Sequence, residues 1–183
     1  MLFLLNDIIN YIIDYEEIDE LLEKVENTYQ EVVVMFYNYS KFTISFSYTK
    51  NLLLNQENKV ALYCIGDEFS VDNCPSSLIY NRHVKNEDEI IYYIMIIITK
   101  YRFRGLGYAS LLLDEFIELV RNENKHKKEK SIKIVLSSLE TSVTFYEKYG
   151  FRWTRESLID HPLLTYYEKY QEGKEYFILE LKI

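Results

Sequence analysis

The chain has 183 residues, of which 48% are hydrophobic and 27% charged, a balance that is typical of a folded protein and excludes intrinsic disorder. The length suits a single domain with a full hydrophobic core. The net charge is −8 and the sequence pI is about 5.0, which argues against a general nucleic-acid-binding surface.

Targeting and membrane signals are missing from the pattern. The apolar run Met1–Leu5 lacks a basic start and is interrupted by Asn6 and Asp7, so it is not typical of a signal peptide. No run approaches the roughly 18 apolar residues of a membrane span. Cys64 and Cys74 are too few for a disulfide framework or a zinc site. We therefore expect a cytoplasmic protein with no membrane contact, reduced thiols and no metal.

The N-terminal part predicts helices followed by strands. Apolar residues recur at steps of three and four between Ile9 and Val25, which predicts one or two amphipathic helices. The acidic residues between Asp7 and Glu26 form either a solvated face or an acidic border that attracts cations. Between Glu31 and Ser47 the alternation of Val32, Val34 and Phe36, and then of Phe42, Ile44 and Phe46, predicts strands.

Strand signals continue through the middle of the chain. Lys59–Ile65 reads as a strand before Gly66, and Ser77–Val84 reads as another. Lys85–Asp88 predicts a hairpin turn into a long apolar central strand that runs to Ile98 and Thr99.

The C-terminal half alternates helices and strands. After Gly107 we expect a helix whose buried face is formed by Leu112, Leu113, Phe116, Ile117 and Val120. Ser131–Ser137 predicts a strand, and Glu140–Tyr149 predicts a helix that Gly150 ends. Phe151–Glu156 and Tyr176–Leu181 predict late strands, with no clear periodicity between Leu158 and Gly173.

The turn with Gly105 and Gly107 is the strongest functional signal. A strand, a glycine turn and an immediate helix place unpaired N–H groups at a helix N-terminus, where they bind anions. A phosphate-binding P-loop needs a Lys after Gly107, and a dinucleotide motif needs a third Gly where Ser110 stands. The pattern Arg/Gln-x-x-Gly-x-Gly/Ala is matched in full by Arg102–Gly107.

A second motif lies downstream at Ser142–Phe151, which reads Ser-Val-Thr-Phe-Tyr-Glu-Lys-Tyr-Gly-Phe. Together the two motifs resemble the GNAT (Gcn5-related N-acetyltransferase) superfamily, in its coenzyme A loop and its Ala-x-x-Phe-Tyr-x-Lys-x-Gly-Phe pattern. Ser142 stands where the family usually has Ala, and Leu139 where many members have an Asn that contacts the cofactor. The resemblance covers roughly residues 87–157.

The resemblance implies one GNAT domain over residues 1–183. Its α/β (α+β) fold has a mixed, mostly antiparallel central sheet, splayed at the middle and flanked by helices. Residues 1–58 supply the variable N-terminal helices and the first strand. The splay leaves backbone groups to which the pantetheine arm binds as if it were another strand.

The resemblance also implies an acetyl-CoA-dependent N-acetyltransferase that moves the acetyl group directly to a primary amine through a tetrahedral intermediate. The acceptor is a small molecule or a protein lysine or N-terminus, and homodimers are common in the family; pairing through Tyr176–Ile183 is one route. The alternative is a non-catalytic acyl-CoA-binding or interaction module with the same fold. The implied cofactor-binding residues are Ile97, Ile98, Thr99, Arg102, Phe103, Arg104, Gly105, Leu106, Gly107, Tyr108 and Ala109.

Tyr146 stands at the position of the family's general acid. A free phenol has a pKa of about 10, so it is protonated at neutral pH and can donate. A core tyrosine is the structural alternative. For the base, Glu89 at the start of the central strand is the first candidate, His83 and His161 are weaker ones, and ordered water is a further alternative.

Overall fold

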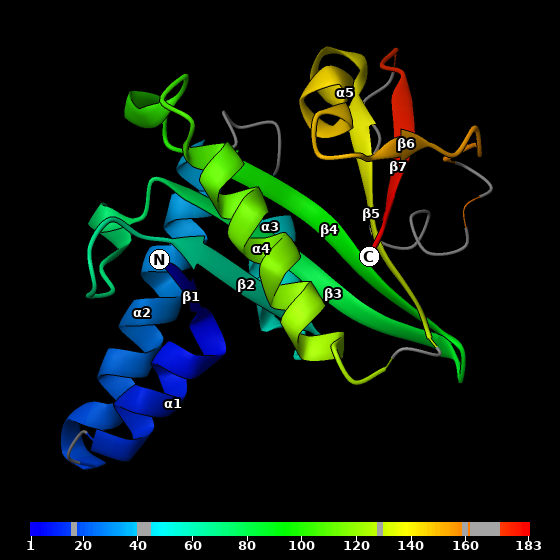
Figure 1. Ribbon diagram of the computed structural model, residues 1–183. Helices are drawn as coiled ribbons and strands as arrows, with labels where there is room; N and C mark the ends of the chain where they lie inside the picture. The colour runs from blue at the N-terminus through cyan, green and yellow to red at the C-terminus, as the bar shows by residue number, and fades with distance from the viewer. Residues whose placement is uncertain (16–17, 40–44, 128–129, 159–160, 162–172) are drawn as a thin grey trace. The chain divides into compact units, whose positions relative to one another are not determined.

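The computed structural model describes residues 1–15, 18–39, 45–127, 130–158, 161 and 173–183. In the described part of the chain one sheet has the strand order β1-β2-β3-β4-β5-β7-β6 (Figure 1). Its strands are β1 (Leu2–Leu4), β2 (Asn58–Tyr63), β3 (Ser76–Asn86), β4 (Glu89–Thr99), β5 (Ser131–Leu139), β6 (Arg152–Trp153) and β7 (Tyr176–Lys182). β4 and β5 are parallel, whereas the β1–β2, β5–β7 and β6–β7 pairs are antiparallel, so the predicted mixed sheet is confirmed.

The chain divides into two compact units, and β3 and β4 contribute to both. Unit 1 comprises Met1–Tyr80 and Ile96–Leu119, and unit 2 comprises Asn81–Met95 and Val120–Ile183.

Unit 1 begins with the predicted N-terminal helices, α1 (Leu5–Tyr15) and α2 (Ile18–Tyr39), which pack side by side (Figure 1). The strand prediction for Glu31–Ser47 was wrong, because α2 continues to Tyr39 and α3 (Phe46–Leu54) follows. The side-chain oxygen of Ser45 caps α3 by accepting the Tyr48 N–H at 3.2 Å.

The helical spacing of α2 explains that error. Val32, Val33 and Phe36 are buried on one face, while Val34, which the alternation placed with Val32, is 46% exposed. The other half of the predicted alternation, Phe42 and Ile44, lies outside the described residues. The strand predicted at Lys59–Ile65 is confirmed as β2.

Helix α4 (Tyr108–Asn124) follows the glycine turn as predicted. The ring of Phe116 lies 4.8 Å from that of Tyr80 in an edge-on contact. The predicted apolar face is buried throughout, at Leu112, Leu113, Phe116, Ile117 and Val120.

Cys64 and Cys74 in unit 1 are joined by a disulfide, so the expectation of reduced thiols was wrong for this structure. The bond connects the residue after β2 to the residue that ends the short 3₁₀ helix η1 (Val71–Asn73). None of the helices described is long and apolar enough to cross a membrane.

Unit 2 is built on the parallel ladder between β4 and β5. Glu89 to Ile94 pair with Ser131 to Leu136, and the ladder stops there although β4 runs to Thr99 and β5 to Leu139. The parallel pairing therefore covers only the first part of each strand, and the expected splay stays a prediction. A core cluster of Ile91, Tyr93, Val135, Leu158 and Ile178 fills the unit.

The end of unit 2 differs from the prediction in two places. Helix α5 (Glu140–Glu147) is followed by the predicted Gly150 at a φ of +90°, and the strand predicted at Phe151–Glu156 is only β6. β7 pairs with β5 along its whole length and with β6 only at Leu179 and Glu180, so pairing of Tyr176–Ile183 with a second copy stays a prediction.

Candidate functional site

The glycine turn joins β4 to α4 in unit 1. After Thr99, Lys100 leads into the 3₁₀ turn η2 (Tyr101–Phe103). Gly105 and Gly107 follow at φ values of +76° and +85°, a left-handed conformation that glycine adopts most readily. A Cβ at either glycine would meet nothing within 4 Å, so the space in front of the turn is open to a ligand.

The backbone donors of the turn fall into two groups. The N–H groups of Phe103, Arg104 and Leu106 donate within the turn, to the carbonyls of Lys100 (2.9 Å), Tyr101 (3.2 Å) and Phe103 (3.4 Å). Between Gly105 and Ala109, four N–H groups have no backbone acceptor within the described part of the chain, and they belong to Gly105, Gly107, Tyr108 and Ala109. Such donors at the N-terminus of a long helix favour an anion, because the helix dipole adds to their charge.

The two arginines of the motif are turned towards the protein. Arg102 donates from Nη2 to the Asp72 carbonyl at 3.1 Å. Arg104 donates from Nε to the Thr99 carbonyl at 3.2 Å and from Nη2 to the Tyr39 carbonyl at 3.3 Å. Both side chains therefore hold the turn to neighbouring backbone. They also carry the positive charge that was expected of them.

Lys100 is a residue that sequence reasoning missed. Only 2% of its surface is exposed, and its Nζ donates to the Val71 carbonyl. Burial lowers the pKa of Lys100, and Arg102 lowers it further against the opposing effect of Asp72. The available signal was the alternation of β4, because Lys100 follows the buried Ile96 and Ile98 at steps of two.

The last residues of β4 present their backbone groups in alternation. The Ile98 carbonyl accepts the Ser76 hydroxyl at 2.8 Å, and the Lys100 N–H donates to the Pro75 carbonyl at 2.9 Å, so these two residues face β3. Ile97 and Thr99 therefore direct their backbone groups to the opposite edge of the strand. Of the three residues predicted to meet the pantetheine arm, Ile97 and Thr99 have the better orientation.

Tyr146 lies in unit 2, in the last turn of α5. Its ring lies 5.0 Å from that of Phe145 and 5.8 Å from that of Phe151. Burial raises the pKa of Tyr146 to about 12. Its hydroxyl has no hydrogen-bonding partner among the residues that the structure describes, so a ligand would not have to displace one there.

Glu89, the first candidate for the base, is held by two lysines at the start of β4. Its carboxylate lies 3.0 Å from Lys133 Nζ and 3.0 Å from Lys85 Nζ, and Lys133 also pairs with Glu180. Hydrogen bonds from Lys133 and then Lys85 lower the pKa of Glu89 despite its partial burial. A lowered pKa and two cationic partners make this carboxylate a weak proton acceptor at neutral pH.

The two histidines considered as bases are also in unit 2. His83 is an exposed residue of β3. His161 Nε2 lies 3.5 Å from a carboxylate oxygen of Glu156. Burial, with a smaller effect from Lys85, lowers the pKa of His161, while Glu156 and Glu180 oppose the shift. These surroundings assign a catalytic role to neither histidine.

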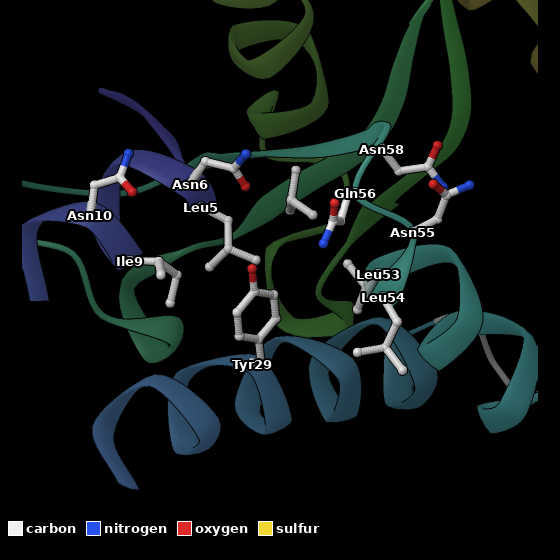
Figure 2. A pocket seen from close by; sticks show the side chains of 11 residues that line it. Leu5, Asn6, Ile9, Asn10, Tyr29, Leu53, Leu54, Asn55, Gln56 and Asn58 are labelled. Atoms are coloured by element: carbon white, nitrogen blue, oxygen red, sulfur yellow. The ribbon is translucent and has the colours of Figure 1, made fainter. Parts of the chain in front are cut away.

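A cavity of about 420 Å³ in unit 1 is lined by α1, α2, the end of α3 and β2 (Figure 2). The Tyr29 hydroxyl and the Gln56 amide point into it, and the charged residue types are missing from its lining. None of the site residues predicted from sequence lines this cavity. The glycine turn in unit 1 and Tyr146 in unit 2 therefore stay two separate candidates, each described within its own unit.

Comparison with known proteins agrees with this geometry. Residues 78–164 match the family described as Acetyltransferase (GNAT) domain, a range that contains both the glycine turn and Tyr146. No curated protein matches the sequence.

Three solved structures illustrate the likeness in fold. The NatC complex bound to Gag peptide and CoA aligns with a TM-score of 0.59 and 14% identity, over 87% of this chain and 94% of that chain. Arabidopsis thaliana Naa50 in complex with the bisubstrate analogue CoA-Ac-MVNAL aligns with a TM-score of 0.55 and 18% identity, over 100% of this chain and 99% of that chain. The ribosomal-protein-S18-alanine N-acetyltransferase from Escherichia coli aligns with a TM-score of 0.57 and 13% identity, over 82% of this chain and 87% of that chain.

Proposed function

Since residues 78–164 match the acetyltransferase (GNAT) domain family, we propose that the chain transfers an acetyl group from acetyl-CoA to a primary amine. The observation that carries this proposal is the group of four backbone donors at the N-terminus of α4, at Gly105, Gly107, Tyr108 and Ala109. We further propose that both compact units belong to one catalytic domain, because β3 and β4 run through both.

The cofactor would be held mainly by backbone groups. The four donors of the turn suit the pyrophosphate, and the positive φ of Gly105 and Gly107 keeps side chains out of its path. The backbone groups of Ile97 and Thr99 suit the amides of the pantetheine arm. Phe103 packs on Tyr108 with ring centroids 5.4 Å apart, which supports the start of α4.

Acetyl-CoA supplies a thioester, whose C–S bond breaks as the amine forms a C–N bond. The Ile97 N–H would stabilise the oxyanion that develops on the carbonyl oxygen. The phenol of Tyr146, with a pKa of about 12, is a weaker acid than a thiol with an ordinary pKa of about 8.5. Its role is therefore to donate a hydrogen bond to the departing thiolate rather than to give up its proton fully.

We assign no side-chain base. Glu89 is committed to Lys133 and Lys85, so the amine would enter in its neutral form or lose its proton through water. The proton that the amine loses balances the one that the thiolate gains.

A peptide N-terminus is the acceptor to test first, and a small amine is the second. The similar structures include one bound to a peptide and one bound to a bisubstrate analogue. The acidic residues exposed on α2, such as Glu20, Glu23 and Glu26, support a cationic acceptor of either kind.

A calorimetric titration with acetyl-CoA tests the proposal, with ATP and NAD as controls. We expect saturable binding of acetyl-CoA alone, followed by release of free thiol when a peptide or a small amine is added. Binding without thiol release from any amine would favour the non-catalytic acyl-CoA-binding module. No binding by folded protein would refute the cofactor assignment.

A further inference from the structure

Lys100 connects the glycine turn to three other segments of unit 1. Its N–H donates to the Pro75 carbonyl, and its own carbonyl accepts the Phe103 N–H, both at 2.9 Å. Its Nζ donates to the Val71 carbonyl in η1 and lies 5.7 Å from the centre of the Tyr39 ring at the end of α2. A single residue thus follows β4, begins the turn and contacts both η1 and α2.

The burial of this ammonium group has a cost. Ile96 and Ile98 precede it on the same face of β4, and an apolar residue at position 100 would continue that pattern. A buried cation costs free energy unless hydrogen bonds compensate it. Lys100 also borders a cavity of about 350 Å³, where Glu31 and Asp72 contribute to the lining. The residue is therefore better explained by the shape it fixes than by core stability.

Arg102 and Arg104 reach the same two segments as Lys100. Arg102 donates to the Asp72 carbonyl in η1, and Arg104 donates to the Tyr39 carbonyl at the end of α2. Carbonyls at a helix C-terminus carry partial negative charge, which favours these cations. The three cations at positions 100, 102 and 104 therefore fasten one side of the turn.

The η1 segment is itself held in place. The Val71 carbonyl that receives Lys100 also accepts the Cys74 N–H at 3.2 Å, and Cys74 is bonded to Cys64 after β2. Lys100 thus connects the turn to a cross-linked loop.

We propose that Lys100 is a positioning residue that holds the glycine turn in the shape that binds the cofactor, an inference that rests on the proposed function. With the turn fixed, the N–H groups of Gly105, Gly107, Tyr108 and Ala109, which have no backbone acceptor among the described residues, are held in place before the ligand arrives. Binding then loses less free energy to ordering the loop.

The decisive variant is Lys100→Met, which keeps the length of the side chain and removes its charge and donors. Lys50→Met on α3 is the matched control, because Lys50 is an exposed lysine of the same unit. We expect Lys100→Met to raise the Kd and the KM for acetyl-CoA about 10-fold to 100-fold, as for loss of a charged hydrogen bond. The KM for the amine and kcat at saturating acetyl-CoA should change less than about threefold.

The rate of amide hydrogen exchange of residues 101–109 in the ligand-free protein is a second measurement, and it does not need the cofactor. Exchange should be faster in Lys100→Met than in the wild type and in Lys50→Met. If Lys100→Met does not fold, Lys100→Gln replaces it, because it keeps a donor without the charge and should show a smaller effect of the same kind.

The outcomes separate the two proposals. Normal acetyl-CoA binding and unchanged exchange in Lys100→Met would overturn the role of Lys100 and leave the proposed function intact. A fall in kcat together with similar rises in the KM values for both substrates would show a general structural role, and it would also overturn the positioning role of Lys100. If the wild type binds no acetyl-CoA, the proposed function and the cofactor role of Lys100 both fail. Faster exchange in the variant would then still show that Lys100 orders the turn.

Discussion

The two compact units use their polar groups in different ways. In unit 1, Lys100, Arg102 and Arg104 donate to backbone carbonyls, whereas four backbone N–H groups of the same turn have no backbone acceptor among the described residues. In unit 2, Lys133 joins the carboxylates of Glu89 and Glu180, so charged groups satisfy one another.

The difference separates the proposed binding feature from a structural one. The donors at the start of α4 have no backbone acceptor among the described residues, and the helix dipole adds to their charge, so they can bind an anion. An ion-pair cluster such as that of Lys133 has little charge left to offer a substrate. Variants in each unit test this contrast.

The largest effect is expected from Gly107→Trp in unit 1. A bulky side chain at a φ of +85° would occupy the open side of the turn and strain its backbone. We expect acetyl-CoA affinity to fall at least about 100-fold, measured by calorimetry, because the donors could no longer approach the pyrophosphate.

Gly173→Trp is the control, since Gly173 has a φ of +77° and a Cβ there would also meet nothing within 4 Å. It shares the backbone strain and should leave affinity within about twofold. Equal losses in the two variants would mean that strain, rather than contact with the cofactor, explains the effect at Gly107.

The next effect concerns the anchor of unit 1. Replacing both cysteines, Cys64→Ser with Cys74→Ser, should lower the free energy of unfolding by about 3 kcal/mol, because the bond closes a loop in the unfolded chain. Thermal melting of the wild type with and without a dithiol reductant makes the same comparison. Melting that does not respond to the reductant would show that the two thiols are not joined in solution.

How far the sequence predicted this molecule depends on the range of the interaction. The glycine turn, the buried face of α4 and the β3–β4 hairpin follow from local spacing, and all were predicted. The alternation of Val32, Val34 and Phe36 favoured a strand, but so short an apolar run does not decide between strand and helix. Helical packing of α2 decided it.

The partners of the charged side chains were beyond such reasoning. Lys100 and Val71 are 29 residues apart, and Glu89 and Lys133 meet only because β4 and β5 pair in parallel. The Cys64–Cys74 bond likewise depends on the path of the chain around η1. Motifs therefore predicted a candidate site and the backbone groups it would use, whereas the partners of Glu89 and Lys100 required the fold.

Tyr146→Phe tests the phenol of unit 2 with a smaller expected effect. Loss of one hydrogen bond to a developing thiolate should lower kcat about 10-fold and leave acetyl-CoA binding within about twofold. Because burial raises the pKa of Tyr146 to about 12, the wild-type rate should not fall from ionisation of this phenol up to about pH 10. Tyr149→Phe, three residues on, is the control. An unchanged kcat in Tyr146→Phe would remove the phenol from the mechanism.

The smallest effect on turnover is expected from Glu89→Gln. If the ion pairs are structural, kcat should stay within about twofold, whereas loss of a general base would cost about 100-fold or more. Stability should fall by about 1 kcal/mol at neutral pH through loss of the pairs with Lys133 and Lys85.

The pH dependence of that loss follows from the lowered pKa of Glu89. Folding favours its ionised form, so the contribution is present above the unfolded pKa of about 4.3 and disappears as pH falls through the folded pKa. The difference in unfolding free energy between the wild type and Glu89→Gln should therefore be constant near neutral pH and shrink below about pH 4. Glu87→Gln, in the exposed hairpin turn, should show neither effect. A large loss of kcat in Glu89→Gln alone would reverse the contrast between the units and make Glu89 the base.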